Sequence, residues 1–267
     1  MNRFQSVFQR TRRENRAALI GYMTAGDPDL ERSYEIFDAA CDAGLDVLEI
    51  GIPFSDPTAD GPVIQRAARR ALAAGMTLKR GIAMAARLRK RHDLPIVLFT
   101  YYNPIMAMSS ERFVAEAIDA GIDGVLVVDL PGERADEIMT HVPDKDQLAF
   151  IRLIGPTTDQ VRRHEILRQA EGFVYVVSRR GVTGSGEIDW KQLENEMNSL
   201  RQKTMTPLCI GFGITTPEDA KRAGAIADGV IVGSAIQRYI EIDPTNAAES
   251  VKAFIQSLSK ALHAGKN

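Results

Sequence analysis

The sequence predicts an α/β protein whose fold class is the (β/α)8 TIM barrel, built as a single domain over residues 1–267 with an extra N-terminal helix. Eight short apolar segments alternate with helical patterns along the chain, and eight parallel strands joined by right-handed helical crossovers close into a barrel. The length of 267 residues is normal for one such barrel. A doubly wound open sheet is the alternative architecture.

The expected strands are short apolar runs, and several of them follow one recurring local unit. In that unit a helix ends in glycine, an acidic residue follows and an apolar run begins, as happens around Gly44, Gly121 and Gly224. Glycine suits the left-handed end of a helix, and an apolar run suits a parallel strand covered on both faces. The strands are expected at residues 18–22, 46–51, 95–100, 124–128, 148–153, 173–177, 207–210 and 229–232.

The segments between the strands read as amphipathic helices. In the first of them, apolar side chains recur on one helical face at Leu30, Tyr34, Phe37 and Cys41. We expect the extra helix at residues 2–14 to close the bottom of the barrel and a helix at 247–263 to pack outside it. No linker, low-complexity segment or change of composition divides the chain, which favours one domain.

The composition excludes several classes of function. A hydrophobic content of 45%, a charged content of 25% and a net charge of −2 describe an ordinary globular protein without the basic surface that nucleic acid requires. No apolar run reaches the ~18 residues of a membrane span, and the first residues do not read as a signal peptide, so we expect a cytoplasmic protein. Two cysteines and four scattered histidines show no metal-ligand spacing, so no metal site is expected.

The first candidate site lies at the end of the second expected strand. Glu49 interrupts an apolar run, and a buried unpaired carboxylate is costly unless it has a function. A solvated or ion-paired strand end is the alternative interpretation. The loop that follows adds Asp60, and Tyr101, Asp129 and Tyr175 lie at or near the ends of later strands. Because barrel enzymes build their sites at the carboxyl ends of the strands, these residues should meet at one mouth.

A second candidate site is a phosphate cradle. Glycine-rich segments at 181–186, 211–213 and 233–234 fall on the last loops of the barrel, where backbone N–H groups and a helix N-terminus commonly bind phosphate. Simple turns are the alternative explanation for these glycines. No lysine is expected at a strand end, which disfavours a Schiff-base or pyridoxal enzyme. The combination indicates acid–base cleavage or isomerisation of a phosphorylated substrate without a cofactor in this chain.

Five stretches carry a resemblance to a known family over nearly the whole length of the chain. They are Thr24-Ala25-Gly26-Asp27-Pro28; the segment Glu49-Ile50-Gly51-Ile52-Pro53-Phe54-Ser55-Asp56-Pro57 with Ala59-Asp60-Gly61-Pro62; Tyr101-Tyr102-Asn103-Pro104; Ser178-Arg179 with Gly181-Val182-Thr183-Gly184; and Gly211-Phe212-Gly213-Ile214 with Gly233-Ser234-Ala235. The chain resembles the tryptophan synthase α-subunit family. Tyr22, Thr58 and Arg152 depart from the residues common in that family.

The resemblance implies retro-aldol cleavage of indole-3-glycerol phosphate to indole and glyceraldehyde 3-phosphate in tryptophan biosynthesis. It also implies an α2β2 complex with a β subunit, which carries pyridoxal phosphate and condenses the indole with serine. Glu49 would move protons, Asp60 would hold the indole N–H, and Tyr175 would assist near the glycerol chain. The other substrate-binding positions implied by the resemblance are Tyr22, Phe99, Tyr101, Leu126, Leu153, Thr183, Gly184, Phe212, Gly213, Gly233 and Ser234.

Two loops are expected to close over this site. Residues 53–60 and 179–187 carry prolines and glycines beside the catalytic positions, and Thr183 should act as a latch that reaches Asp60. Two alternatives remain open from the residues alone. One is a barrel isomerase of a phosphoribosyl-type substrate, and the other is a non-catalytic partner subunit.

Overall fold

The computed structural model describes residues 2–177, 188–211 and 213–264. Its strands form a single sheet in the order β5-β4-β3-β2-β1-β9-β8-β7-β6, and every pairing between them is parallel. The strands are β1 Ala18–Thr24, β2 Val47–Gly51, β3 Ile96–Thr100, β4 Gly124–Val127, β5 Ala149–Phe150, β6 Arg152–Ile154, β7 Val174–Val177, β8 Leu208–Gly211 and β9 Gly229–Val232.

The sheet closes on itself through the pair β5 and β6. These strands flank a single residue, Ile151, whose backbone N–H donates to the carbonyl of Val125 at 2.9 Å. The segment that the sequence predicts as one strand at 148–153 therefore appears as two short strands on one line, with β4 on one side and β7 on the other. The predicted TIM barrel is confirmed, and the open sheet is excluded.

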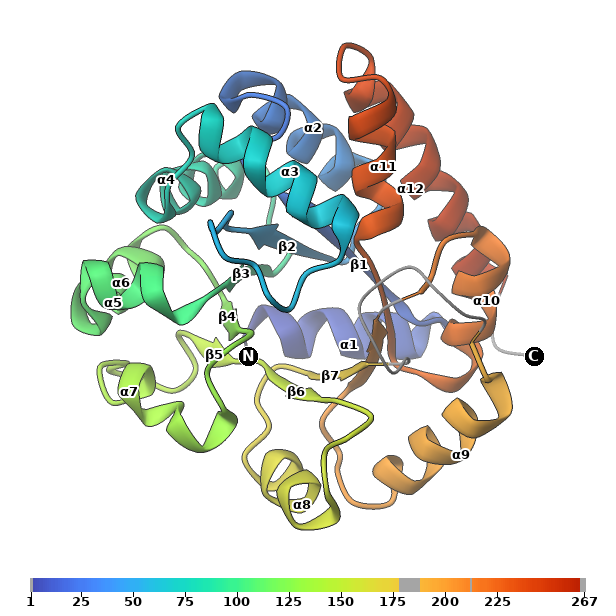
Figure 1. Ribbon diagram of the computed structural model, residues 1–267. Coiled ribbons are helices and arrows are strands. Elements are labelled where there is room, and N and C mark those ends of the chain that lie inside the picture. Colours follow the sequence, from blue (N-terminus) through green and yellow to red (C-terminus); the bar gives the residue numbers. More distant parts are fainter. Residues whose placement is uncertain (1, 178–187, 212, 265–267) are drawn as a thin grey trace.

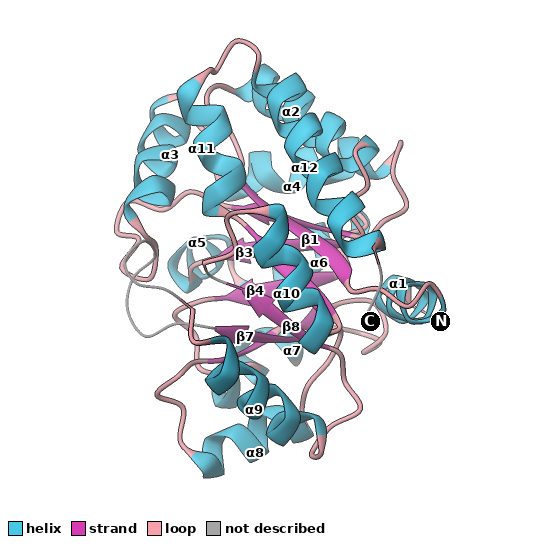
Figure 2. Ribbon diagram, turned by 90° about the vertical axis from the view of Figure 1, so that its right-hand side faces the viewer, coloured by secondary structure: helices cyan, strands magenta, loops and turns pink. Residues whose placement is uncertain are grey.

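Helices surround the sheet, as Figures 1 and 2 show. Among the described residues, no helix is both long and apolar enough to cross a membrane. A 3-10 turn spans Gly132–Arg134. The α-helices are α1 Arg3–Arg13, α2 Leu30–Asp42, α3 Pro62–Ala73, α4 Leu78–Arg89, α5 Tyr102–Met108, α6 Ser110–Asp119, α7 Asp136–Met139, α8 Gln160–Arg168, α9 Trp190–Arg201, α10 Pro217–Ile226, α11 Ser234–Ile242 and α12 Ala247–His263.

Two hydrophobic clusters follow from the alternation of side chains along each strand. On β2, Leu48 and Ile50 belong to the outer cluster between sheet and helices, whereas Val47 belongs to the inner cluster that fills the barrel. Because successive side chains point to opposite faces, Glu49 must point into the barrel with Val47. The same alternation directs Tyr22 of β1 and Phe99 of β3 inward.

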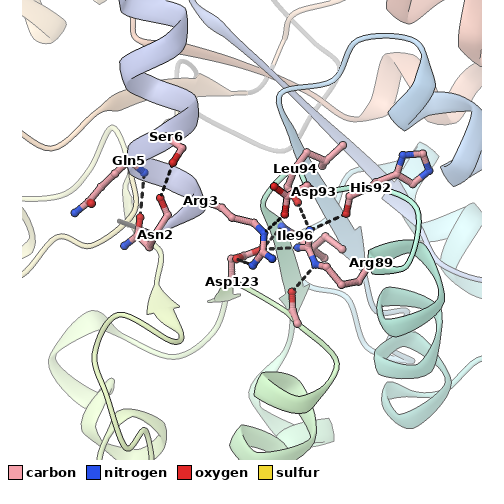
Figure 3. Close-up of polar contacts among 11 residues, drawn as sticks. Asn2, Arg3, Gln5, Ser6, Arg89, His92, Asp93, Leu94, Ile96 and Asp123 are labelled. Atoms are coloured by element: carbon pink, nitrogen blue, oxygen red, sulfur yellow. Dashed lines mark hydrogen bonds and ion pairs between the residues drawn. The ribbon is translucent and has the colours of Figure 1, made fainter.

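The bottom of the barrel is closed by α1, as predicted. Phe4 and Phe8 of this helix pack against Phe173 at ring-centroid distances of 5.9 and 6.2 Å. Arg3 ties the helix to the barrel through Asp93, at 2.7 Å, and Asp123, at 3.0 Å (Figure 3). These contacts leave the opposite end, where the strands finish, open for a site.

The acidic residue of the recurring unit has a structural role that the sequence did not reveal. Asp46, Asp123 and Asp228 each accept a hydrogen bond, at 2.8–2.9 Å, from a backbone N–H where a neighbouring strand begins. Each carboxylate also pairs with an arginine, respectively Arg16, Arg89 and Arg201. The repeat therefore satisfies backbone donors at the closed end of the barrel.

Candidate active site

A cavity opens at the carboxyl ends of the strands. It is bounded by the ends of four strands, by the start of α3 and by the start of α11. Seven of the predicted site residues line it, together with four residues that were not predicted as site residues, Gly61, Ile64, Ile214 and Ile231. The seven are Tyr22, Asp60, Phe99, Tyr175, Gly213, Gly233 and Ser234.

Glu49 is completely buried inside the barrel. Neither carboxyl oxygen has a hydrogen-bond partner among the described residues. Burial alone raises the pKa of Glu49 to about 8, because the charged form loses its hydration. The alternative of a solvated strand end is therefore wrong, and the side chain is protonated at neutral pH. A protonated carboxyl in an enclosed site can act as a general acid.

Asp60 ends the loop that connects β2 to α3. Its Oδ2 accepts a hydrogen bond from the Oη of Tyr101 at 3.1 Å, and the Tyr101 oxygen in turn accepts one from the N–H of Ala59 at 3.1 Å. Burial raises the pKa of Asp60 to about 6, while the bond from Tyr101 acts in the opposite direction. Phe54 stacks on the Tyr101 ring at 4.9 Å, so this tyrosine contacts the loop at both ends.

Two inward-facing tyrosines form the aromatic wall of the cavity. A Cβ on Gly51 would lie 2.3 Å from the Tyr22 hydroxyl, and a Cβ on Gly211 would lie 2.2 Å from the Tyr175 hydroxyl. Each ring therefore occupies space that only glycine leaves free on the adjacent strand. Tyr22 also meets Phe99 edge to face at 5.2 Å. Burial raises the pKa of both tyrosines well above the usual value, so both rings stay neutral.

The start of α11 provides the described part of the predicted phosphate cradle. Gly233 caps this helix without a side-chain hydrogen bond, and Ser234 is the first helical residue. The first N–H groups of a helix have no intrahelical partner and carry the positive end of its dipole, which favours an anion. Gly213 enters the same cavity with a φ of +85°, a conformation that suits glycine.

Leu126 and Leu153 line a second cavity, whose lining shares no residue with that of the first. Leu126 belongs to the inner cluster and Leu153 packs against it. Asp129 lies in this second cavity as well, and its carboxylate accepts the N–H of Tyr102 at 2.7 Å. The three residues are therefore at the barrel mouth but outside the lining of the first cavity.

Arg152 also borders the second cavity, and the structure gives it a physical role that the sequence did not. Its guanidinium lies on the outer face of the sheet, where it donates to the carbonyl of Phe150 at 3.3 Å and to Oε1 of Gln169 at 3.0 Å. Burial lowers its pKa. Arg152 thus connects β6 with the end of α8 rather than with Glu49 or Asp60.

Three predicted site residues, Thr183, Gly184 and Phe212, lie outside the described residues. The same is true of the loop at 179–187 that was expected to close over the site. The latch between Thr183 and Asp60 therefore stays a prediction. Among the described residues no cluster of three or more metal-ligating side chains is found.

The closed barrel, the buried carboxyl group and the start of α11, whose first N–H groups favour an anion, define a TIM-barrel enzyme. The family model described as tryptophan synthase alpha chain matches residues 8–264. The chain belongs to the tryptophan synthase alpha chain family.

Individual relatives agree with this assignment. The tryptophan synthase alpha chain of Desulfatibacillum aliphaticivorans is 46% identical over 264 residues, covering 99% of this chain and 98% of the relative. The alpha chain of Geobacter sulfurreducens is 43% identical, covering 98% of this chain and 99% of the relative. The crystal structure of the tryptophan synthase alpha chain from Legionella pneumophila superimposes with a TM-score of 0.88 at 34% identity. The match covers 98% of this chain and 97% of that chain. A structure of Mycobacterium tuberculosis tryptophan synthase gives a TM-score of 0.89 at 29% identity, covering 98% of each chain.

Proposed function

We propose that this chain is the α subunit of tryptophan synthase and cleaves indole-3-glycerol phosphate to indole and glyceraldehyde 3-phosphate. The observation that carries the proposal is the carboxyl group of Glu49, which is buried in the barrel without a partner among the described residues. A proton donor held in this way suits a reaction that must protonate a carbon atom. The identity of the substrate is inferred from the family assignment.

The proton transfers form a closed cycle. Protonated Glu49 donates to C3 of the indole ring and creates a cation, while the Asp60 carboxylate binds the ring N–H and balances the charge. The Glu49 carboxylate then removes the proton from the glycerol hydroxyl. The O–H electrons form the aldehyde C=O bond, and the electrons of the breaking C–C bond return to the ring. Glu49 ends protonated, as it began, and Tyr175 assists beside the glycerol chain.

The remaining site residues bind the two ends of the substrate. Tyr22, Phe99 and Tyr101 offer aromatic surface for the indole ring, and Leu126 and Leu153 extend this apolar surface at the barrel mouth. Gly233 and Ser234 offer backbone donors for the phosphate at the start of α11, and Gly213 offers one from the loop after β8. Phe212, Thr183 and Gly184 are assigned to the same two tasks by family resemblance.

The proposed chemistry assigns no cofactor to this chain. Pyridoxal phosphate belongs to the β subunit, which condenses the released indole with serine in an α2β2 complex. The exposed loop at 53–60, beside the site, is the proposed contact through which the partner favours closure. We place the complex in the cytoplasm, and we treat residues 1–267 as one domain because a single barrel accounts for the described elements.

The direct test is indole release from indole-3-glycerol phosphate, measured for the chain alone and with its β subunit. We expect release in both cases, with a higher rate in the complex. A folded chain that releases no indole under either condition would refute the proposed activity and would leave the non-catalytic partner subunit as the better account.

A further inference from the structure

Two helices carry opposite ends of the proposed substrate site. Asp60 and Gly61 immediately precede α3 and line the cavity where the indole ring is expected, and Gly233 and Ser234 begin α11 where the phosphate is expected. The two helices pack against each other, as Figures 1 and 2 show. Whatever fixes α3 relative to α11 therefore fixes the distance between the two halves of the site.

A buried carboxylate lies between these helices. Asp27, in the loop after β1, has a side chain with no exposed surface. Arg70 of α3 donates to both of its oxygens, from Nε at 2.7 Å and from Nη2 at 2.9 Å. From the other side, the amide of Gln237 on α11 donates to Oδ2 of the same carboxylate. The Gln237 oxygen accepts the backbone N–H of Thr24, at 2.9 Å, which ties the assembly to the end of β1.

A second connection lies one helical turn further along α11. Glu241 accepts hydrogen bonds from Arg66 at 2.6 and 2.8 Å and from Nη1 of Arg70 at 3.1 Å. Arg66 and Arg70 are four residues apart on α3, and Gln237 and Glu241 are four residues apart on α11, so both pairs share one helical face. Arg70 takes part in both connections and is the central member of the network.

We propose that Arg70 is a positioning residue that holds the indole-binding and phosphate-binding halves of the site at the separation the intact substrate requires. A bidentate arginine–carboxylate pair fixes direction as well as distance, and a lysine would not reproduce its geometry. The inference rests on the proposed function for the identity of the two ligand halves. Arg70 itself is not among the residues that line the cavity.

A comparison of linked and unlinked ligands distinguishes a positioning role of Arg70 from simple stabilisation of the fold. A ligand that joins an indole ring to a phosphate gains affinity from binding both halves at once, and this gain depends on their separation. The separate fragments, indole and inorganic phosphate, do not require that separation. Indole-3-propanol phosphate, which has no hydroxyl groups on its three-carbon chain, is a suitable linked probe.

The experiment compares Arg70→Met and Arg70→Lys with the unmodified chain by equilibrium binding. We expect affinity for indole-3-propanol phosphate to fall by roughly tenfold or more in both variants, while affinities for indole and for inorganic phosphate stay within about twofold. Arg69→Met, which removes an exposed charge from the same helix, is the matched control and should leave all three affinities unchanged.

Glu241→Gln is the second variant, in case Arg70→Met does not fold. The Glu241 side chain is only partly buried, so its replacement should disturb the fold less. It should show the same selective loss at smaller size. Equal weakening of the linked probe and the fragments, or no weakening of the linked probe in any folded variant, would overturn the proposal. Failure of the unmodified chain to release indole would refute the proposed activity alone, because these binding measurements do not depend on cleavage.

Discussion

The hydroxyl of Tyr101 donates a hydrogen bond to Oδ2 of Asp60 at 3.1 Å, from the end of β3 to the loop before α3. Burial raises the pKa of Asp60 to about 6, and this hydrogen bond keeps it from rising further because it stabilises the charged form. Tyr101 therefore helps to keep Asp60 negative at neutral pH, where the proposed mechanism needs a carboxylate beside the indole nitrogen.

Replacing Tyr101 by Phe should shift the acidic limb of the pH profile of kcat/KM to higher pH. In the free enzyme the profile should rise as Asp60 ionises near pH 6 and fall as Glu49 loses its proton near pH 8. Loss of the hydroxyl raises the pKa of Asp60 and leaves Glu49 unchanged, so only the acidic limb should move.

The measurement is kcat/KM for indole release between about pH 5 and pH 9. Tyr102→Phe is the matched control, because the Tyr102 hydroxyl bonds to Glu137 rather than to Asp60. Titration of the substrate phosphate affects all three proteins equally. An acidic limb that stays in place in Tyr101→Phe would show that the hydrogen bond does not govern Asp60.

Glu49→Gln should make the protein more stable at alkaline pH. The folded chain holds this proton to about pH 8, whereas the unfolded chain releases it near the ordinary value of 4.5. The unfolded state therefore binds fewer protons between these values, and the free energy of unfolding falls as pH rises through that window. Gln cannot ionise, so the Glu49→Gln variant does not lose stability in this way as the pH rises.

Urea unfolding of both proteins at about pH 5 and pH 8 measures this effect. The advantage of Glu49→Gln should grow between the two conditions by an amount on the order of a few kcal/mol. Glu35→Gln, at an exposed position on α2, is the control, because it removes one surface carboxyl group without changing the barrel interior. An advantage that is the same at both pH values would contradict a buried carboxyl with a raised pKa.

Gly233→Ala should weaken phosphate binding several-fold. A Cβ at this position would lie 3.2 Å from Cδ1 of Tyr22, so the tyrosine or the start of α11 must shift slightly. Such a shift disturbs the N–H groups proposed to bind the phosphate. Gly155→Ala is the control, since its Cβ would meet only Thr158 at an ordinary 3.7 Å. Calorimetric titration with glycerol phosphate tests the prediction, which fails if the two variants bind alike.

The sequence predicted most of the barrel because each strand and helix carries its own local signal. Apolar runs and the 3.6-residue period depend on neighbouring residues, so the predicted strands agree with the structure to within one or two residues. Gly44 and Gly121 end their helices with a positive φ as predicted, but the prediction for Gly224 was wrong, because this glycine lies inside α10. Asp60 and Tyr175 were placed at the mouth because the ends of parallel strands meet there, whereas Tyr22 and Phe99 were expected from the family resemblance. Only the strand at 148–153 is divided, at Ile151.

The contacts between distant segments were not predictable in this way. Arg70 and Asp27 are 43 residues apart, and Gln237 and Asp27 are 210 residues apart, so no periodic pattern joins them. The role of Arg152 was equally unpredictable, because its side-chain partner Gln169 lies at the end of a helix that the sequence does not place next to it. The lack of a partner for Glu49 among the described residues likewise required the folded structure.

The role of Glu49 is tested most directly by indole release from indole-3-glycerol phosphate in the Glu49→Gln variant, assayed with the β subunit present. Gln keeps the shape of the side chain but cannot carry the proton, so turnover should fall by about 10²-fold or more while affinity for indole-3-propanol phosphate stays within a few-fold. A folded Glu49→Gln protein that retains near-normal turnover would contradict the account.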